Sequence, residues 1–489
     1  MNGRLFRMFA GVAGGLFLAG CVSAPTPGSR QEAWTPPRDA LKPDTVWQAV
    51  RAQAPDLSKP LALADLADLA LRNSPACQQA WSEAHAAAAQ VDQAQGLFMP
   101  EVTAVAGVSR LNTDAKPDSF NQGYLKAAPA LQVNYLILNF GGGRRAAVEQ
   151  ALQTVYAADF AFNQALQDTL LAVETAYYSL ASAEAGIEAA QAGVKDTDTA
   201  LNAARERKAA GTGTELEVLQ AQASSDQARY VLAHAEGLVK IARGELARAA
   251  GLAADAPLRA VPPTGDLPPA LTVQDVGRLL DEALARRPDI AALRAGLAAR
   301  ESGVKVASAA LWPSLYLDGS LAYDTFNDLG GREIQDRDWA SQVGLSLRWT
   351  LFDGNQTRSA RRAARDQADA ARARLRQAEL AAGSDVWSRY QSYETALQKL
   401  VFSTAFLKSA TASYDLALDS YKAGLRSILD LLNAESLTAQ ARSQQIAARQ
   451  DAFTALTRLA HAVGLLEKGG SARAPDLLLN PSQKKDDRP

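Results

Sequence analysis

Residues 210–223 read AGTGTELEVLQAQA and residues 423–436 read AGLRSILDLLNAES, so one pattern occurs twice with an offset of 213 positions, 423 against 210. Segments that keep their spacing over such a distance build the same structural unit twice. The sequence therefore predicts an internal duplication, with one repeat over residues 61–270 and another over residues 271–466. The same offset relates further pairs of landmarks: Pro75 and Pro288, Pro100 and Pro313, Gly141 and Gly354, Tyr177 and Tyr390, and Gly251 and Gly464.

Each repeat contains two segments in which apolar and polar residues alternate. In the second repeat, Leu345, Leu347 and Trp349 alternate with Ser346 and Arg348. A period of two, with apolar residues on one face and polar residues on the other, indicates a strand whose faces meet different environments. We predict strands over residues 101–112, 124–138, 314–324 and 340–352.

The second strand of the first repeat is out of phase with its counterpart. Its apolar residues have the opposite parity from the one that the offset predicts; they are Leu131, Val133, Tyr135 and Ile137. One extra residue in a strand shifts the phase in this way. We therefore expect a β-bulge ahead of Gly141.

A long helical pattern follows each pair of strands and ends at Gly211 or Gly424. At 1.5 Å per residue, a helix of about 65 residues is roughly 100 Å long. A second helix returns from Thr214 in the first repeat and from Ser427 in the second. The sequence predicts two long helical hairpins, with turns near residues 211–214 and 424–427.

Four strands with one apolar and one polar face fit a transmembrane barrel with a wet interior. Four strands cannot close, and an open sheet in lipid leaves unpaired backbone groups that cost several kcal/mol each. Three chains supply twelve strands, whereas two chains supply a barrel too narrow for a useful channel. We therefore expect a mixed α+β membrane protein that forms a homotrimer with a 12-stranded β-barrel.

The N-terminus has the features of a secretion signal. An apolar stretch from Met8 to Leu18, too short to span a bilayer, follows two arginines and leads into Ala19-Gly20-Cys21. This arrangement resembles a bacterial lipobox, which implies a lipid on Cys21, and the Val22 that follows implies delivery to the outer membrane. Ordinary cleavage beside an unmodified cysteine is the alternative. We expect a signal peptide over residues 1–20, a lipidated tether over 21–60 and a disordered tail over 467–489.

The sequence offers little material for catalysis. The formal charge of −2 does not indicate a nucleic-acid partner, and the three histidines, His85, His234 and His461, lie at unrelated positions. The glycines at 141–143 lack the Lys-Ser/Thr ending of a phosphate-binding loop, so we interpret them as a hinge between strand and helix. We expect no enzyme activity, no metal, and no cofactor apart from the covalent lipid on Cys21.

The chain resembles the TolC/outer-membrane efflux protein family, as a lipoprotein-type member. The resemblance runs from about Leu61 to Leu465 and rests on the duplicated plan and on segments 210–219 and 421–430. It implies that the barrel continues into a long α-helical coiled tunnel in the periplasm. It also implies docking on a periplasmic adaptor (a membrane fusion protein) and an inner-membrane pump or ABC exporter. The implied location is the cell outer membrane, with a lipid anchor and an extension into the periplasm.

In that family the hairpin turns form a tip of the tunnel that polar links hold closed. On this resemblance, Tyr421 and Arg426 match gate residues that bind the acid at Glu217, Asp430 matches an inward-facing acid, and Asn433 replaces a second one. The turn residues expected at the docking site of the adaptor are Gly211, Thr212, Gly213, Gly424 and Leu425. The residues alone leave another interpretation open, because Thr214-x-x-Glu217 and Ser427-x-x-Asp430 both match helix capping boxes.

Two functions follow from these patterns. One is a passive trimeric exit duct of a tripartite efflux or type I secretion system, and the other is a non-conducting periplasmic coiled-coil scaffold lipoprotein. The alternating segments favour the duct, because a coiled-coil scaffold has no use for strands with a wet and an apolar face. The sequence does not identify the cargo, which could be a drug, a metal, another small molecule or a protein.

Overall fold

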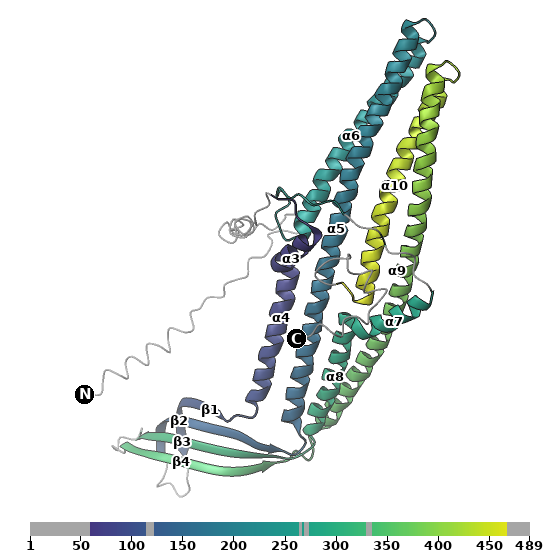
Figure 1. Ribbon diagram of the computed structural model, residues 1–489. Helices are drawn as coiled ribbons and strands as arrows, with labels where there is room; N and C mark the ends of the chain where they lie inside the picture. The colour runs from purple at the N-terminus through teal and green to yellow at the C-terminus, as the bar shows by residue number, and fades with distance from the viewer. Residues whose placement is uncertain (1–58, 114–121, 264–266, 268–272, 329–334, 467–489) are drawn as a thin grey trace, which may run out of the picture. The chain divides into compact units, whose positions relative to one another are not determined.

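The computed structural model describes residues 59–113, 122–263, 267, 273–328 and 335–466 (Figure 1). All of these residues belong to one unit of the chain, Asp56–Pro489. The predicted signal peptide, the lipid attachment site at Cys21, nearly all of the tether and the tail over 467–489 lie outside the described residues.

The elements follow one order twice: a short helix, a longer helix, two strands, a helix of 67 residues and a returning helix. The first set is α3 (Leu63–Asn73), α4 (Pro75–Gly96), β1 (Glu101–Thr113), β2 (Gln122–Asn139), α5 (Gly143–Ala209) and α6 (Glu215–Ala249). The second set is α7 (Val273–Arg286), α8 (Pro288–Ala309), β3 (Ser314–Asp328), β4 (Gln335–Arg348), α9 (Gln356–Lys422) and α10 (Ile428–Val463). The four predicted strands and the two long hairpins are thus confirmed.

Three strand boundaries in the second repeat were wrong. β3 ends at Asp328 instead of residue 324, and β4 begins at Gln335 instead of residue 340. The third is the far end of β4. The predicted fourth strand ran to residue 352, but β4 ends at Arg348, although Trp349 and Leu351 continue the alternation. The Trp349 indole Nε1 donates a hydrogen bond to the carbonyl of Leu311, 3.2 Å away, at the end of the helical segment that precedes β3. The residues after Arg348 therefore form the connection to α9 instead of extending the sheet.

The strands form one antiparallel sheet in the order β1-β2-β3-β4, so the two repeats meet between β2 and β3. The register brings the apolar residues of all four strands to the same face, since Val102 pairs with Val133 and Leu317 pairs with Leu345. These side chains are uncovered within one chain, and Leu345 is 68% exposed. An apolar sheet face of this kind needs a non-aqueous neighbour.

The predicted β-bulge is confirmed in β2. Leu136 pairs with Tyr316 and Leu138 pairs with Leu315, which leaves Ile137 as an extra residue. From the bulge to the end of β2, just ahead of Gly141, the side chains therefore point to the opposite faces from those that the earlier alternation predicts. The same region needs a residue without a side chain, because a Cβ at Gly141 would lie 2.5 Å from the Cα of Ala309.

The opposite face of the sheet carries a polar network. The Asp318 carboxylate accepts hydrogen bonds from Asn134 Nδ2 (2.7 Å), Ser346 Oγ (2.6 Å) and Arg348 Nη2 (3.1 Å). The Arg348 guanidinium also lies over the ring of Tyr316, 4.5 Å from its centroid. Charged groups linked across three strands fix this face as the hydrated side of the sheet.

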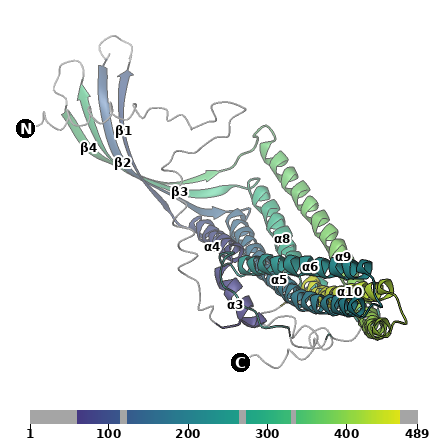
Figure 2. The same cartoon turned by 90° about the horizontal axis from the view of Figure 1, so that it is seen from above.

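The helices lie side by side next to the sheet. α4 packs on α5, α5 on α8, and α8 on α9, in the order of the strands that they adjoin. Figures 1 and 2 both show the strands leading into the ends of these helices. Farther from the sheet, α6 and α10 take the places next to α5 and α9. One chain therefore presents a wall of helices with α4 and α6 toward one edge and α9 at the other.

Short helices brace this wall at equivalent places in the two repeats. Leu66 of α3 packs with Tyr177 and Leu246 in one apolar cluster, and Leu279 of α7 packs with Tyr390 and Leu459 in another. Gly251 and Gly464 end the returning helices with φ of +72° and +78°, a backbone conformation that favours glycine. A Cβ at these glycines would lie 2.7 Å from Asn73 and 3.2 Å from Arg286, which end α3 and α7.

Candidate functional site

The two hairpin turns close in the same way. After α5, Gly211 has φ +73° and Thr212 N donates to Arg207 O at 2.9 Å; after α9, Gly424 has φ +74° and Leu425 N donates to Ser420 O at 2.9 Å. These bonds satisfy the last carbonyls of each long helix, and they need a left-handed residue. The predicted turn residues thus lie together at the ends of the hairpins, and Leu425 is 79% exposed there.

A hydrogen bond joins the two hairpins beside the turns. The Tyr421 hydroxyl at the end of α9 donates to Glu217 Oε2 near the start of α6, over 2.7 Å. Tyr421 is fully buried, and burial together with this carboxylate raises the pKa of its phenol to about 12. The contact that the family resemblance implied for this pair is therefore present within one chain.

Arg207 is a member of this contact that the sequence analysis missed. Its guanidinium lies 4.5 Å from the centroid of the Tyr421 ring, and it donates to Tyr421 O at 2.7 Å and to Thr212 O at 3.2 Å. The available clue was its position as a basic residue in the last turn of a helix, where carbonyls lack partners. Arg207 thus binds both turns at once.

The other predicted gate residues are arranged differently. Asp430 accepts from the backbone N–H of Ser427 at 3.1 Å and from its hydroxyl at 2.9 Å, in a complete capping box that lowers the pKa of this carboxyl. Within the described part of the chain, Arg426 makes no bond to Glu217, and both Arg426 and Asn433 are exposed. One chain therefore brings together Tyr421 and Glu217 but not Arg426.

The two acids consequently play different local roles. Thr214 Oγ1 accepts from the backbone N–H of Glu217 at 3.3 Å, as a helix cap does, but the Glu217 carboxylate is directed to Tyr421. Asp430 directs its carboxylate back to its own cap. The capping interpretation thus accounts for Asp430, whereas the Glu217 side chain forms a link between hairpins.

A second polar contact joins the hairpins farther from the turns. Ser224 Oγ of α6 donates to both carboxylate oxygens of Glu435 in α10, at 3.0 and 3.2 Å. Next to it, Arg442 Nη1 binds Asp196 Oδ2 at 2.7 Å, and the Tyr414 hydroxyl donates to Asp196 O at 3.1 Å. Burial, reinforced by the charge of Asp196, raises the pKa of Glu435 to about 6.

The raised pKa of Glu435 predicts how the stability of the folded chain depends on pH. A carboxyl with a higher pKa in the folded chain binds its proton more tightly there, so folding is favoured at low pH. The stability contribution is complete below about pH 4.5 and declines as the pH rises to about 6. In neutral solution the folded chain thus carries the cost of a half-buried charge.

We predict that Glu435→Gln removes this cost and stabilises the protein at pH 7.5 by about 1–2 kcal/mol, following the size of the pKa shift. Thermal unfolding at several pH values tests this. The contribution of Glu435 lowers Tm of the wild type between pH 4.5 and 6, and this decrease is absent in the variant. Glu236→Gln, an exposed residue of α6, serves as the control and leaves the profile unchanged. A variant that is less stable than the wild type at pH 7.5 would contradict the assignment.

The described residues contain no group of three or more His, Cys, Asp or Glu side chains that could hold a metal ion. Among the same residues, no helix is both long enough and apolar enough to cross a membrane.

The family description "Outer membrane efflux protein" matches residues 66–252 and 279–465. Protein CyaE of Bordetella pertussis is 32% identical over 392 residues, which cover 79% of this chain and 80% of CyaE. Pyoverdine export outer membrane protein OpmQ of Pseudomonas aeruginosa is 28% identical over 423 residues, which cover 80% of this chain and 82% of OpmQ.

Solved structures of outer-membrane proteins share the fold. The outer-membrane channel OprN matches with a TM-score of 0.71 at 24% identity, over 82% of this chain and 89% of OprN. VceC of Vibrio cholerae matches with a TM-score of 0.71 at 22% identity, over 86% of this chain and 98% of VceC. The two family matches start and end 213 residues apart, so both repeats are recognised independently. This chain belongs to the outer membrane efflux protein family.

Proposed function

We propose that this chain is the outer-membrane channel component of a tripartite efflux or type I secretion system. It acts as a passive exit duct that docks on a periplasmic adaptor and on an inner-membrane pump or ABC exporter. The observation that carries this proposal is a sheet with one apolar and one polar face, joined to two helical hairpins whose helices reach 67 residues. A non-conducting scaffold would leave the apolar face of that sheet without a purpose.

The proposed duct is a homotrimer. β1 and β4 are the outer strands of the sheet, and α4 and α9 flank the helices on the corresponding sides. Pairing β4 of one chain with β1 of the next satisfies the free backbone groups that lipid would otherwise leave unpaired. Three chains then supply twelve strands for a barrel, and the helical walls close into a tunnel along the same seams.

The cargo is set by the pump that the duct serves. Relatives are named for different cargoes, since OpmQ is named for pyoverdine export and AprF of Pseudomonas aeruginosa for alkaline protease secretion. The exposed turn residues at Thr212 and Leu425 offer the adaptor a docking surface at the hairpin ends. Because the sequence lacks a phosphate-binding loop, the transport energy comes from the partner proteins.

We also propose that Cys21 carries lipid and anchors the mature protein in the outer membrane. Metabolic labelling with a palmitate analogue tests this, and we expect the label to be lost in Cys21→Ser. One or two acyl chains add little to twelve spanning strands, so Cys21→Ser still inserts once it has been processed. A free thiol at Cys21 in the mature wild-type protein would rule out the modification.

The barrel proposal predicts opposite effects for one substitution on the two sheet faces. Val343→Arg puts a charge on the apolar face, near the middle of β4, and destabilises the inserted protein by roughly 2–4 kcal/mol near the middle of the membrane. Gln342→Arg, at nearly the same depth, is the matched control, because Gln342 lies on the polar face opposite Ser320. Folding into lipid vesicles, followed by urea titration, measures both effects. Equal losses in the two variants would contradict the assignment of the apolar face alone to lipid.

The polar contact at the tip is proposed as the gate of the duct. Two hydrogen bonds join the hairpins: the Tyr421 hydroxyl donates to the Glu217 carboxylate, and Arg207 donates to the carbonyl of Tyr421. Arg426 is proposed to face the neighbouring chain and Asp430 to face inward toward the threefold axis, and Asn433 leaves the ring with fewer acids and so a weaker affinity for cations. Hydrogen bonds to charged groups contribute about 1.5–3 kcal/mol each, so loss of the Tyr421 hydroxyl shifts the equilibrium toward the open state.

We predict that Tyr421→Phe combined with Arg426→Ser raises single-channel conductance in planar bilayers, with an open population at least about tenfold larger. Tyr230→Phe, at an exposed tyrosine of α6, is the control and leaves conductance unchanged. Circular dichroism separates gating from capping, because loss of a helix cap reduces helix content. Unchanged conductance with reduced helix would assign these residues to capping, and a wild type that forms no channel at all would refute the duct.

A further inference from the structure

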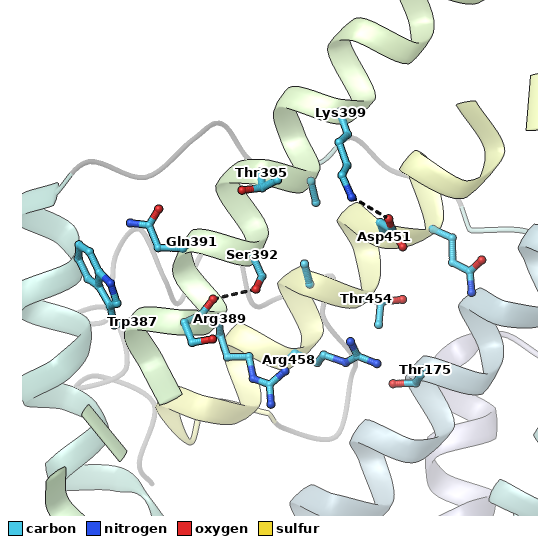
Figure 3. A pocket seen from close by; sticks show the side chains of 14 residues that line it. Thr175, Trp387, Arg389, Gln391, Ser392, Thr395, Lys399, Asp451, Thr454 and Arg458 are labelled. Carbon is cyan, nitrogen blue, oxygen red and sulfur yellow. Dashed lines mark hydrogen bonds and ion pairs between the residues drawn. The ribbon is translucent and has the colours of Figure 1, made fainter. Parts of the chain in front are cut away.

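A polar pocket of about 710 Å³ lies between α9 and α10, next to Thr175 of α5. Figure 3 shows Arg389 and Arg458 at one end of this pocket and the Lys399–Asp451 pair at the other. Ser392 and Thr395 line it from α9. It lies well away from the hairpin turns along α9 and α10, and the gate proposal does not use it.

The pocket opens on the side of α9 and α10 that α7 does not cover. Ala452 and Leu456 belong to the apolar cluster that α7 joins, and Thr454 and Arg458 follow them by two residues each. Two residues turn an α-helix by about 200°, so Thr454 and Arg458 lie on the opposite face. If three copies of α7 lay inside a closed ring, they would obstruct the passage. A conducting trimer therefore has α7 outside and this pocket on its inner wall.

The pocket has an excess of positive charge. Arg389 Nε binds Asp385 Oδ1 at 3.1 Å, and Lys399 Nζ lies 3.8 Å from Asp451 Oδ2 in an exposed pair. Among the described residues, Arg458 has no hydrogen-bond or ion-pair partner. Thr454 is 8% exposed, and its Oγ1 is buried without a hydrogen-bond partner in the same part of the structure. One cation and one hydroxyl per chain thus remain available for a ligand.

We propose that the pocket around Arg458 is an anion-binding site on the inner wall of the duct, which receives the carboxylate or phosphate group of a passing solute. This inference rests on the proposed function. A guanidinium presents paired N–H donors that match the two oxygens of such groups, and the hydroxyls of Ser392 and Thr395 lie in the same pocket. Three such sites around the axis form a basic ring, whereas Asp430 contributes acids at the tip.

Ion selectivity of the purified trimer in planar bilayers tests the site. The reversal potential in a potassium chloride gradient gives the ratio of anion to cation permeability, and added inorganic phosphate tests occupancy by reducing the current. In Arg458→Gln we expect this ratio to fall by about fivefold, the effect of one unit charge near contact in water, and the phosphate effect to disappear. Arg458→Lys retains the ratio but responds less to phosphate, because an ammonium lacks the paired donors.

Arg449→Gln is the matched control, since Arg449 is in the same helix but lies over Phe453, 5.9 Å from the ring centroid, and lines a different pocket. It leaves both readouts unchanged. Equal selectivity in the wild type and Arg458→Gln overturns the anion-binding site but does not contradict the proposed duct. So does an Arg458→Gln protein that dissociates into single chains, which would mean that Arg458 binds an acid of the neighbouring copy. A wild type without conductance refutes the duct itself.

Discussion

The unpaired backbone groups at the outer edges of β1 and β4 are the main constraint on this structure. Every backbone N–H and C=O in the membrane needs a partner, and a four-stranded sheet leaves one row of these groups free at each edge. The apolar face of the sheet is not covered by the chain's own helices, since Leu345 on that face is 68% exposed. In the proposed duct, other copies of the chain pair with these edges, and the helices beside the edges join the same assembly.

The two repeats build equivalent hairpins, but the residues that join these hairpins at the tip differ between the repeats. Tyr421 stands where the first repeat has Lys208, and Arg207 stands where the second has Ser420, so the tip joins unlike residues from equivalent positions. The extra residue at Ile137 and the tight approach of Gly141 to Ala309 are likewise confined to the first repeat.

Local periodicity predicted most of the fold, and long-range contacts explain what it missed. Strands, long helices and even the bulge at Ile137 followed from parity and spacing, because each depends on neighbouring residues. The end of β4 did not, since Trp349 keeps the alternating pattern and only its bond to Leu311 shows that the sheet has ended. Arg207 was missed for the same reason: its acceptor at Tyr421 is 214 residues away in the sequence.

The distribution of packing along the helices is consistent with the proposal that the duct opens at the hairpin turns. Alanine makes up five of the ten buried residues of the cluster at the tip, against eleven of thirty-one in the two clusters near α3 and α7, where leucine, valine and tyrosine make up the rest. Burial of smaller side chains removes less apolar area from water, so separating the hairpins costs less there than farther down. The polar bonds of Tyr421, Glu217 and Arg207 then supply a large share of what holds the tip together. In the proposed duct, an adaptor that offers replacement partners for those few groups separates the hairpins while the region near α3 and α7 stays packed.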